Sequence, residues 1–325
     1  MPELDAERIA ALCRGFVESR LMLTAAELDL FSKLAGKWLT VDEVALPERW
    51  DTRALRILLD ALVVTGLLVK RAGTYSTTPL AAEFLARDGA MTILDNALHG
   101  AELWHQWSRL TSCVVGAGLP PQLDHNSAFI GAMHLLSPRL APGIAALVRP
   151  EQARRFLDVG GGSGAYTMAF LNRDRTLKAT ILDLPEVLPI CREHLIEGDF
   201  LEHVELVAGD LTRDEFPGGQ GLVLLSAIIH MLSLPQNIEL FRRCFRALLP
   251  GGRVVIRDYV MSADRLQPRA GTLFAVNMLV ATEGGDTHTF AEIRSALAAA
   301  GFVEPRVLQD GERMNAVIEA YRPRE

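Results

Sequence analysis

The sequence predicts an α/β protein in which a mostly parallel sheet, covered by helices, follows a smaller helical domain. Three observations support this class. The length of 325 residues exceeds what one typical hydrophobic core accommodates. From Arg154 onward, short β-rich runs alternate with helical stretches. In about the first 90 residues, apolar side chains instead recur at three- and four-residue intervals, as in amphipathic helices.

The first domain, residues 1–91, is predicted to be a winged helix. Thr40, with Glu43 at the capping-box position, starts one helix, and Asp51 caps the next. Two short strands then form a hairpin around Gly73. The expected segments are helices over Ala6–Ser19, Thr24–Leu34 and Thr52–Thr65, and strands over 67–70 and 74–77.

Winged helices often bind DNA, so a cofactor-binding regulator is one hypothesis for this chain. The helix over 52–65 offers few cations beyond Arg53 and Arg56, and the net charge of the chain is −7. Contact with phosphates needs a basic surface. The sequence therefore favours a packing or dimerising role for the first domain and predicts no nucleic-acid partner.

The second domain, residues 92–325, begins with linker and roof helices over 92–146. Trp104, Phe129 and Met133 lie on their apolar faces, and core packing is the simplest interpretation for each of them alone. As a group they also suit the roof of a pocket for a flat aromatic ligand. The sheet follows, and its last two strands, joined by residues 311–313, are expected to form an antiparallel hairpin at the edge.

The chain is expected to be a cytoplasmic protein with no disulfide framework, no metal site and no membrane contact. Its four cysteines share no C-x-x-C spacing, and charged residues interrupt the N-terminal stretch where a signal peptide would be apolar. The longest apolar run, about Leu222–Ile229, is far below the roughly 20 residues that span a bilayer.

A glycine-rich loop follows the first strand of the sheet, from Asp158 to Gly164. Glycines allow positive φ and close approach of the backbone to a ligand, and the helix start behind the loop offers free N–H groups. The spacing Gly160-x-Gly162-x-Gly164 is that of methyltransferases. However, Gly160-x-Gly162-x-x-Ala165 also satisfies the dinucleotide pattern, so the loop alone leaves a dehydrogenase open.

Acidic residues after the next two strands bear on this choice. Asp183 suits ribose hydroxyls in either cofactor class and does not decide between them. Asp210 follows the third strand, where it can accept a hydrogen bond from an adenine amino group while Leu211 packs on the ring. Together with the loop spacing and the antiparallel end of the sheet, these residues favour S-adenosylmethionine over a nicotinamide cofactor.

These segments resemble the class I O-methyltransferases of the plant caffeate and bacterial polyketide or phenazine type. The resemblance covers nearly the whole chain, through runs such as FLDVGGGSG, ILDLPEV, VAGDL and LPGGRVVIRD. It implies an N-terminal winged-helix dimerisation domain, a Rossmann-like catalytic domain and a homodimer. It also implies S-adenosylmethionine as the cofactor, with S-adenosylhomocysteine as the product and no metal.

The resemblance further implies roles for single positions. His230, after the fourth strand, falls where the family keeps its general base, and Asp258 matches a glutamate that flanks that histidine. Phe129 and Met133 correspond to substrate-contacting positions, and we expect Trp104 and Asn277 to contact substrate as well. The expected cofactor-binding residues are Asp158, Gly160, Gly162, Gly164, Asp183, Leu184, Asp210, Leu211 and Ser226.

The chain also departs from the family pattern around the expected base. Met231 and Leu232 stand where the family usually has Asp and Trp, and Ser226 replaces a lysine that touches the cofactor in plant members. A second glutamate beside the histidine becomes Thr287, unless Asp286 or Glu283 supplies that carboxylate.

The sequence thus predicts O-methylation of a small aromatic or polyketide-like hydroxyl compound. The sulfonium of the cofactor already activates the methyl group, so the protein mainly aligns the nucleophile. A phenol must also lose its proton, and an imidazole such as that of His230 is suited to accept it. Three alternatives stay open: a structural His230 bonded to a backbone carbonyl, C- or N-methylation on the same scaffold, and a winged-helix regulator.

Overall fold

The computed structural model describes residues 6–116 and 127–325 and divides into two compact units after His105. The boundary falls later than the predicted division after residue 91. The reason is helix α7 (Leu94–Trp107), which buries Leu94, Ala97 and Ala101 in the apolar core of the N-terminal unit. The first roof helix therefore shares a core with the segments before it.

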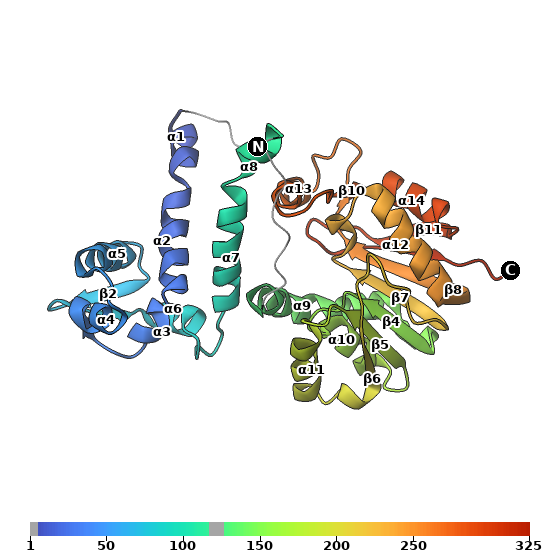
Figure 1. Ribbon diagram of the computed structural model, residues 1–325, viewed down its shortest axis with the longest axis horizontal. Coiled ribbons are helices and arrows are strands. Elements are labelled where there is room, and N and C mark those ends of the chain that lie inside the picture. The colour runs from blue at the N-terminus through green and yellow to red at the C-terminus, as the bar shows by residue number, and fades with distance from the viewer. Residues whose placement is uncertain (1–5, 117–126) are drawn as a thin grey trace. The chain divides into compact units, whose positions relative to one another are not determined.

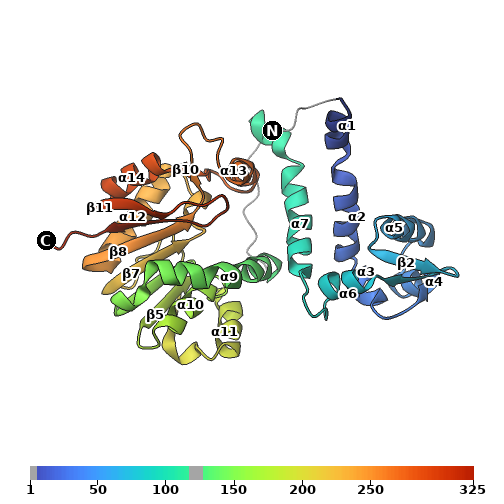
Figure 2. The same cartoon turned by 180° about the vertical axis from the view of Figure 1, so that it is seen from behind.

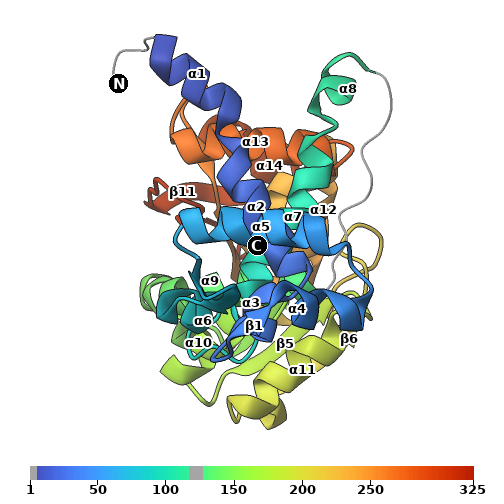
Figure 3. The same ribbon diagram turned by 90° about the vertical axis from the view of Figure 1, so that its left-hand side faces the viewer.

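The N-terminal unit has the predicted helix, helix and hairpin order (Figure 3). The Thr40–Glu43 capping box and the Asp51 cap are confirmed. The two helices predicted over residues 6–34 are three in the structure. The helical conformation is interrupted at Gly15 and again at Asp29, whose φ is 52°. The elements are α1 (Ala6–Arg14), α2 (Phe16–Glu27), α3 (Leu30–Leu34), α4 (Val41–Glu48), α5 (Thr52–Val64) and α6 (Pro79–Leu85), with β1 (Leu39–Thr40), β2 (Leu68–Arg71) and β3 (Thr74–Thr77) as an antiparallel sheet.

A seven-stranded sheet forms the centre of the C-terminal unit, in the order β11-β12-β8-β7-β4-β5-β6. Neighbouring strands from β8 to β6 run parallel, whereas β12 is antiparallel to β8 and β11 is antiparallel to β12. The predicted antiparallel hairpin at the edge is confirmed. The strands are β4 (Arg155–Val159), β5 (Lys178–Asp183), β6 (Val204–Ala208), β7 (Gln220–Ser226), β8 (Leu248–Asp258), β11 (Val303–Gln309) and β12 (Ala316–Tyr321).

Helices cover both faces of this sheet (Figures 1 and 2). One apolar layer lies under α9 (Ser127–Val148), α10 (Ala165–Arg173) and α11 (Leu188–Glu197), and the other lies under α12 (Leu234–Ala247) and α14 (Phe290–Ala299). Residues alternate between these layers along each strand, so Phe156 and Leu224 face the first layer while Leu157 and Leu225 face the second. In the described residues, no helix combines the length and apolar character needed to cross a membrane.

The carboxyl ends of the parallel strands meet at one edge of the sheet, where ligands bind in such folds. Two features beyond that edge had no counterpart in the sequence prediction. Helix α13 (Arg269–Ala281) is one, and the short parallel pair of β9 (Val260–Met261) with β10 (His288–Thr289) is the other. β9 follows Asp258 closely in the chain, and β10 follows Asp286, whose backbone contacts His230. Phe274 of α13 packs on the His230 ring, so these elements border the expected base.

Candidate active site

All three predicted loop glycines adopt the left-handed region, with φ of 68° at Gly160, 56° at Gly162 and 76° at Gly164. A side chain at Gly160 would place its Cβ 2.4 Å from Cδ1 of Ile228, so the positive φ favours glycine there and any larger residue would displace the Ile228 side chain. At Gly162 a Cβ would meet no atom within 4 Å. The loop is therefore tightly packed at its start and open at its middle, as a ligand cradle requires.

Asp158 is the penultimate residue of strand β4, beneath this loop, and is only 1% exposed. Its Oδ2 accepts a hydrogen bond of 2.7 Å from the Thr167 hydroxyl, while Oδ1 is buried without a partner among the described residues. Burial, with a smaller contribution from the charge of Asp183, raises the pKa of Asp158 to about 7 even though the Thr167 hydrogen bond opposes the shift. This carboxyl group has unused capacity for a donor or a cation.

Asp183 ends strand β5 and connects its loop to the glycine loop. Its Oδ2 accepts a hydrogen bond of 2.7 Å from the backbone N–H of Gly162, and its Oδ1 accepts one of 2.8 Å from that of Leu184. The structure thus places the predicted residues Asp183, Leu184 and Gly162 in direct contact.

Asp210 and Leu211 follow strand β6, at the end of the same row of loops. Asp210 Oδ1 accepts hydrogen bonds from the backbone and the hydroxyl of Thr212, at 2.8 and 2.6 Å. Burial opposes ionisation, but these bonds and the nearby charges of Arg213 and Arg243 outweigh it and lower the pKa of Asp210. Leu211 packs against the apolar layer under α12 and α14. A charged acceptor and an apolar side chain therefore stand side by side.

His230 lies in a short 3-10 turn, η3 (Ile229–Met231), just after strand β7. Its Nδ1 is 2.9 Å from both carboxylate oxygens of Asp258, and its backbone N–H donates to Asp258 at 3.4 Å. His230 is 6% exposed and Asp258 is 1% exposed. Because a carboxylate accepts, this contact places a proton on Nδ1 and leaves the lone pair on Nε2. Among the described residues, Nε2 has no hydrogen-bond partner.

Buried side chains brace the turn that carries His230. Asn237 Nδ2 donates to the backbone carbonyls of Ile229 and Leu232, at 2.8 and 3.2 Å. His288 Nε2 lies 3.2 Å from the same two oxygens. His288 is thus a structural histidine of the kind that was the alternative interpretation for His230.

The second carboxylate beside His230 is not supplied by either candidate. The Asp286 side chain pairs with Arg265 at 3.1 Å, and only its backbone N–H reaches the His230 carbonyl, at 2.9 Å. Glu283 is exposed, and Thr287 is buried without a charge. Among the described residues, Asp258 is therefore the one acid on the His230 ring.

Helix α13 covers His230. The Phe274 ring meets the His230 ring edge-on, with centroids 4.9 Å apart and planes at 89°. One turn further, the Asn277 side-chain oxygen accepts a hydrogen bond of 2.9 Å from Trp107 Nε1. Asn277 thus shares a helix with Phe274, which contacts His230. The side-chain oxygen of Asn277 already accepts the hydrogen bond from Trp107.

The other predicted substrate contacts lie elsewhere or outside the described residues. Trp104 packs in the N-terminal unit, where its ring lies 6.0 Å from that of Phe16 and under the Arg20 guanidinium at 5.7 Å. Phe129 and Met133 belong to helix α9 by their backbone, but their side chains lie outside the described residues. A substrate role for these three remains a prediction.

The sequence prediction missed a histidine pair beside the glycine loop. His134 Nδ1 lies 2.8 Å from the Ser163 hydroxyl, and its ring stacks on that of His194 with centroids 3.8 Å apart. Burial and the neighbouring His194 lower the pKa of His134. No local motif marks either residue, because they come from α9 and α11 and meet only in the folded chain.

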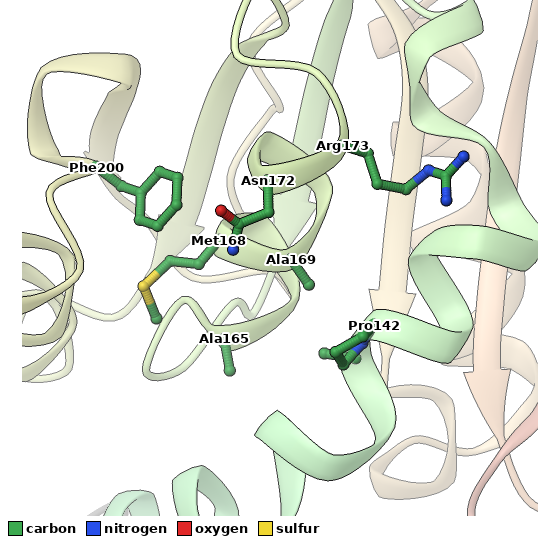
Figure 4. A pocket seen from close by; sticks show the side chains of 8 residues that line it. Pro142, Ala165, Met168, Ala169, Asn172, Arg173 and Phe200 are labelled. Atoms are coloured by element: carbon green, nitrogen blue, oxygen red, sulfur yellow. The ribbon is translucent and has the colours of Figure 1, made fainter.

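A groove of about 460 Å³ lies on the outer side of α10, between that helix, α9 and Phe200. Figure 4 shows Ala165, Met168 and Asn172 of α10 lining this groove. Asn172 is exposed there, whereas Ala165 is buried, as are Tyr166 and Thr167 on the same helix. None of the predicted cofactor or base residues lines this groove. Within the described residues, acidic, histidine and cysteine side chains nowhere gather as a set of metal ligands.

Comparisons with known proteins agree with this geometry. A family model described as the O-methyltransferase domain matches residues 144–303, and one described as the O-methyltransferase dimerisation domain matches residues 10–87. The chain is 31% identical over 311 residues to the tetracenomycin polyketide synthesis 8-O-methyl transferase TcmO of Streptomyces glaucescens, covering 92% of this chain and 91% of the relative.

Two further matches are similar in extent. The 3-hydroxy-5-methyl-1-naphthoate 3-O-methyltransferase of Streptomyces sahachiroi is 29% identical over 312 residues, covering 92% of this chain and 90% of the relative. The solved structure of PigF with S-adenosylhomocysteine superposes with a TM-score of 0.84 at 25% identity, covering 98% of this chain and all of the other.

Proposed function

The chain belongs to the S-adenosylmethionine-dependent O-methyltransferase family, and from this premise we propose that His230 is the general base of its reaction. The observation that carries the proposal is the contact of His230 Nδ1 with both oxygens of Asp258 at 2.9 Å. It fixes the tautomer and aims the basic Nε2 away from the carboxylate.

The residues around the glycine loop fit the cofactor of this family. The open space at Gly162 leaves room for a ligand, and the unpartnered Asp158 oxygen suits the ammonium group of a methionine moiety. We assign the ribose to Asp183 and Leu184, and the adenine to Asp210 and Leu211. When bound, S-adenosylmethionine supplies a methyl group that its sulfonium already activates.

The remaining work falls to the protein's own side chains. Nε2 of His230 accepts the proton of the acceptor hydroxyl as the oxygen becomes a nucleophile. Asp258 holds the Nδ1 proton throughout and stabilises the imidazolium that forms. Phe274 packs against the histidine edge-on and excludes water from one side of the ring. A single carboxylate is sufficient for both tasks.

The acceptor class follows from the relatives and from the apolar character of α13. TcmO acts in polyketide synthesis and the Streptomyces sahachiroi enzyme acts on a hydroxynaphthoate. We propose a hydroxylated aromatic acceptor of similar kind, contacted by Asn277, Phe129 and Met133. Turnover of a phenol and naphthol panel, followed as S-adenosylhomocysteine release, tests this. NMR of the product shows whether oxygen, carbon or nitrogen carries the methyl group.

Replacement of His230 tests the base directly. In His230→Ala the hydroxyl proton has no acceptor, so we expect kcat on a phenol to fall roughly 10²- to 10⁴-fold. S-Adenosylhomocysteine affinity should stay within about twofold, since the cofactor residues lie on other loops. His203→Ala, at an exposed histidine, is the matched control and should leave the rate unchanged. A His230→Ala enzyme within a few-fold of wild type would rule out base catalysis there.

We further propose that the N-terminal unit forms a homodimer, because the dimerisation-domain match coincides with exposed apolar side chains. Ile9, Leu12, Phe16 and Val17 of α1 and α2 are 43–71% exposed. Burial of such a patch against a second copy accounts for it. Light scattering on the wild type and on a Leu12→Asp, Phe16→Asp variant measures the mass; a monomeric wild type at micromolar concentration would contradict the proposal.

A further inference from the structure

Arg257 is a buried cation without an anion. It is the penultimate residue of β8 and is 8% exposed. Among the described residues, its Nε has no partner, and its Nη1 reaches the Ser226 hydroxyl alone, at 3.5 Å. In the part of the chain that the structure describes, no carboxylate lies within ion-pairing distance of this guanidinium. Burial of an unpaired charge is strongly unfavourable, so the site is incomplete as it stands.

Arg253 on the same strand shows what a satisfied buried arginine looks like. It is 9% exposed and points to the same face of β8, four residues earlier. Its Nη1 donates to Glu319 at 2.7 Å, and its Nη2 donates to the backbone carbonyls of Val148 and Arg149. Arg253 is thus paired with the carboxylate of Glu319, whereas no carboxylate of the described residues pairs with Arg257.

The strand register places Arg257 beside the glycine loop. Arg257 pairs with Ser226 of β7, and the preceding residue of β7, Leu225, pairs with Val159 at the end of β4. The Arg257 guanidinium lies 5.2 Å from the ring centre of Tyr166, in the first turn of the helix that follows the loop. Of the two groups against the guanidinium, Ser226 ends strand β7, and Tyr166 lies in the helix that follows the cofactor loop.

Adjacent residues of β8 face opposite sides of the sheet. Asp258 turns to His230, and Arg257 turns to the layer that holds Asp158 and Tyr166. The anion that completes Arg257 therefore comes from the cofactor side and not from the acceptor side.

We propose that Arg257 binds the α-carboxylate of the methionine moiety of S-adenosylmethionine. This rests on the cofactor of the family and extends it to a residue on β8. The guanidinium offers several N–H donors in a plane, which suits a carboxylate. Tyr166 holds the guanidinium against its ring face. Arg257 is thus a binding and positioning residue that ties the amino-acid end of the cofactor to the strand of Asp258.

The test compares two ligands that differ only in this carboxylate, S-adenosylmethionine and decarboxylated S-adenosylmethionine, by calorimetry without acceptor. We expect wild type to prefer the carboxylated ligand roughly 10- to 100-fold, as for a charge-assisted hydrogen bond. In Arg257→Met the preference should fall to near onefold, and Arg257→Lys should retain part of it. Arg253→Met is the matched control, with lower stability but an unchanged preference.

Thermal unfolding separates binding from folding. Arg257→Met removes an unpaired buried charge, so the ligand-free variant should unfold at the same or a higher temperature than wild type, with a smaller shift on adding S-adenosylmethionine. An unchanged preference in Arg257→Met would overturn the proposal, as would equal weakening of both ligands. A raised KM for a carboxylated acceptor alone would assign Arg257 to the acceptor. Failure of wild type to bind S-adenosylmethionine would overturn the cofactor assignment and this proposal with it.

Discussion

Asp158 and Asp258 lie at the carboxyl ends of two strands of the same sheet, as the penultimate residue of β4 and the last residue of β8. They are equally buried, but the chain surrounds them differently. Asp258 receives N–H groups from the His230 ring, the His230 backbone and the Tyr259 backbone. Asp158 receives one hydroxyl, from Thr167, and keeps one oxygen without a partner. Donors, and not depth, decide what a buried carboxylate does. Asp258 is committed to the histidine, whereas Asp158 is left for a ligand.

The same contrast extends to the two regions around them. The cofactor region is shaped mainly by backbone, through glycine conformations and N–H groups. The base region is held by side chains that reach the backbone of the His230 turn, as Asn237 does. This second region also holds three departures from the family pattern, at Met231, Leu232 and Thr287. A region built on side chains can be altered one residue at a time.

Removal of the Asp258 charge should have the largest effect. Asp258→Asn cannot stabilise the imidazolium or fix the Nδ1–H tautomer, so we expect kcat to fall roughly 10³- to 10⁴-fold. Cofactor affinity should be nearly unchanged. Asp258→Glu keeps the charge and should recover most of the rate. Rate measurements with a phenol that wild type methylates compare wild type, Asp258→Asn and Asp258→Glu. Equal rates in the two variants would show that the charge of Asp258 is irrelevant.

Removal of the Asp158 charge should instead appear in stability. The pKa is raised in the folded chain, so the folded state holds a proton that the unfolded chain releases, and stability is lost as pH rises from about 4 to about 7. The loss for ligand-free wild type is at most about 4 kcal/mol. Asp158→Asn should match wild type near pH 4 and exceed it near pH 8.

Urea unfolding at both pH values checks this, with Thr167→Val as a companion. Loss of the Thr167 donor should move the pH window of the Asp158 loss upward, because that bond opposes the raised pKa. A pH profile of Asp158→Asn that coincides with wild type would contradict a protonated Asp158.

A smaller loss is expected from the side-chain brace of the base. Asn237→Ala leaves the buried carbonyls of Ile229 and Leu232 with fewer donors, which should cost about 1–3 kcal/mol of unfolding free energy. Asn172→Ala, on the exposed side of α10, should change stability by less than about 0.5 kcal/mol. Denaturant unfolding compares the two; equal stability would mean that the brace is dispensable.

The smallest change should come from the open part of the glycine loop. Gly162→Ala meets no neighbour, so only its positive φ is penalised, at about 1–2 kcal/mol. Gly160→Ala adds a collision with Ile228 and should be clearly worse. Thermal melts of the two variants without ligand decide this, and similar melting temperatures would show that the loop gives way at Ile228.

Much of the fold was predictable because local chemistry and periodicity determine it. The Thr40–Glu43 capping box, the Asp51 cap and the strand–helix alternation after Arg154 all appear as predicted. The break at Asp29 was not predictable, since a positive φ at an aspartate has no distinct sequence signal. Helix α7 shares the core of the N-terminal unit, and core membership of this kind depends on tertiary packing that local periodicity does not reveal.

The candidate site divides in the same way. The glycine loop, Asp183 and His230 follow strands directly, so a motif reveals them. Arg257 offered one faint signal, a cation near the end of an otherwise apolar strand. The stacked His134 and His194 come from separate helices, and only the packing of α9 against the loop brings them to Ser163.

Ile228 links the glycine loop to the turn that carries His230. Its Cδ1 fills the space that Gly160 leaves vacant, two residues before the base. The glycine loop and the turn that carries His230 therefore meet at this contact. A substitution at Gly160 or at Ile228 affects both segments. Helix α13 contacts His230 through the Phe274 ring, and that ring takes no part in the contact between Gly160 and Ile228. A substitution at Phe274 therefore changes the surroundings of His230 while the contact between the glycine loop and Ile228 is kept.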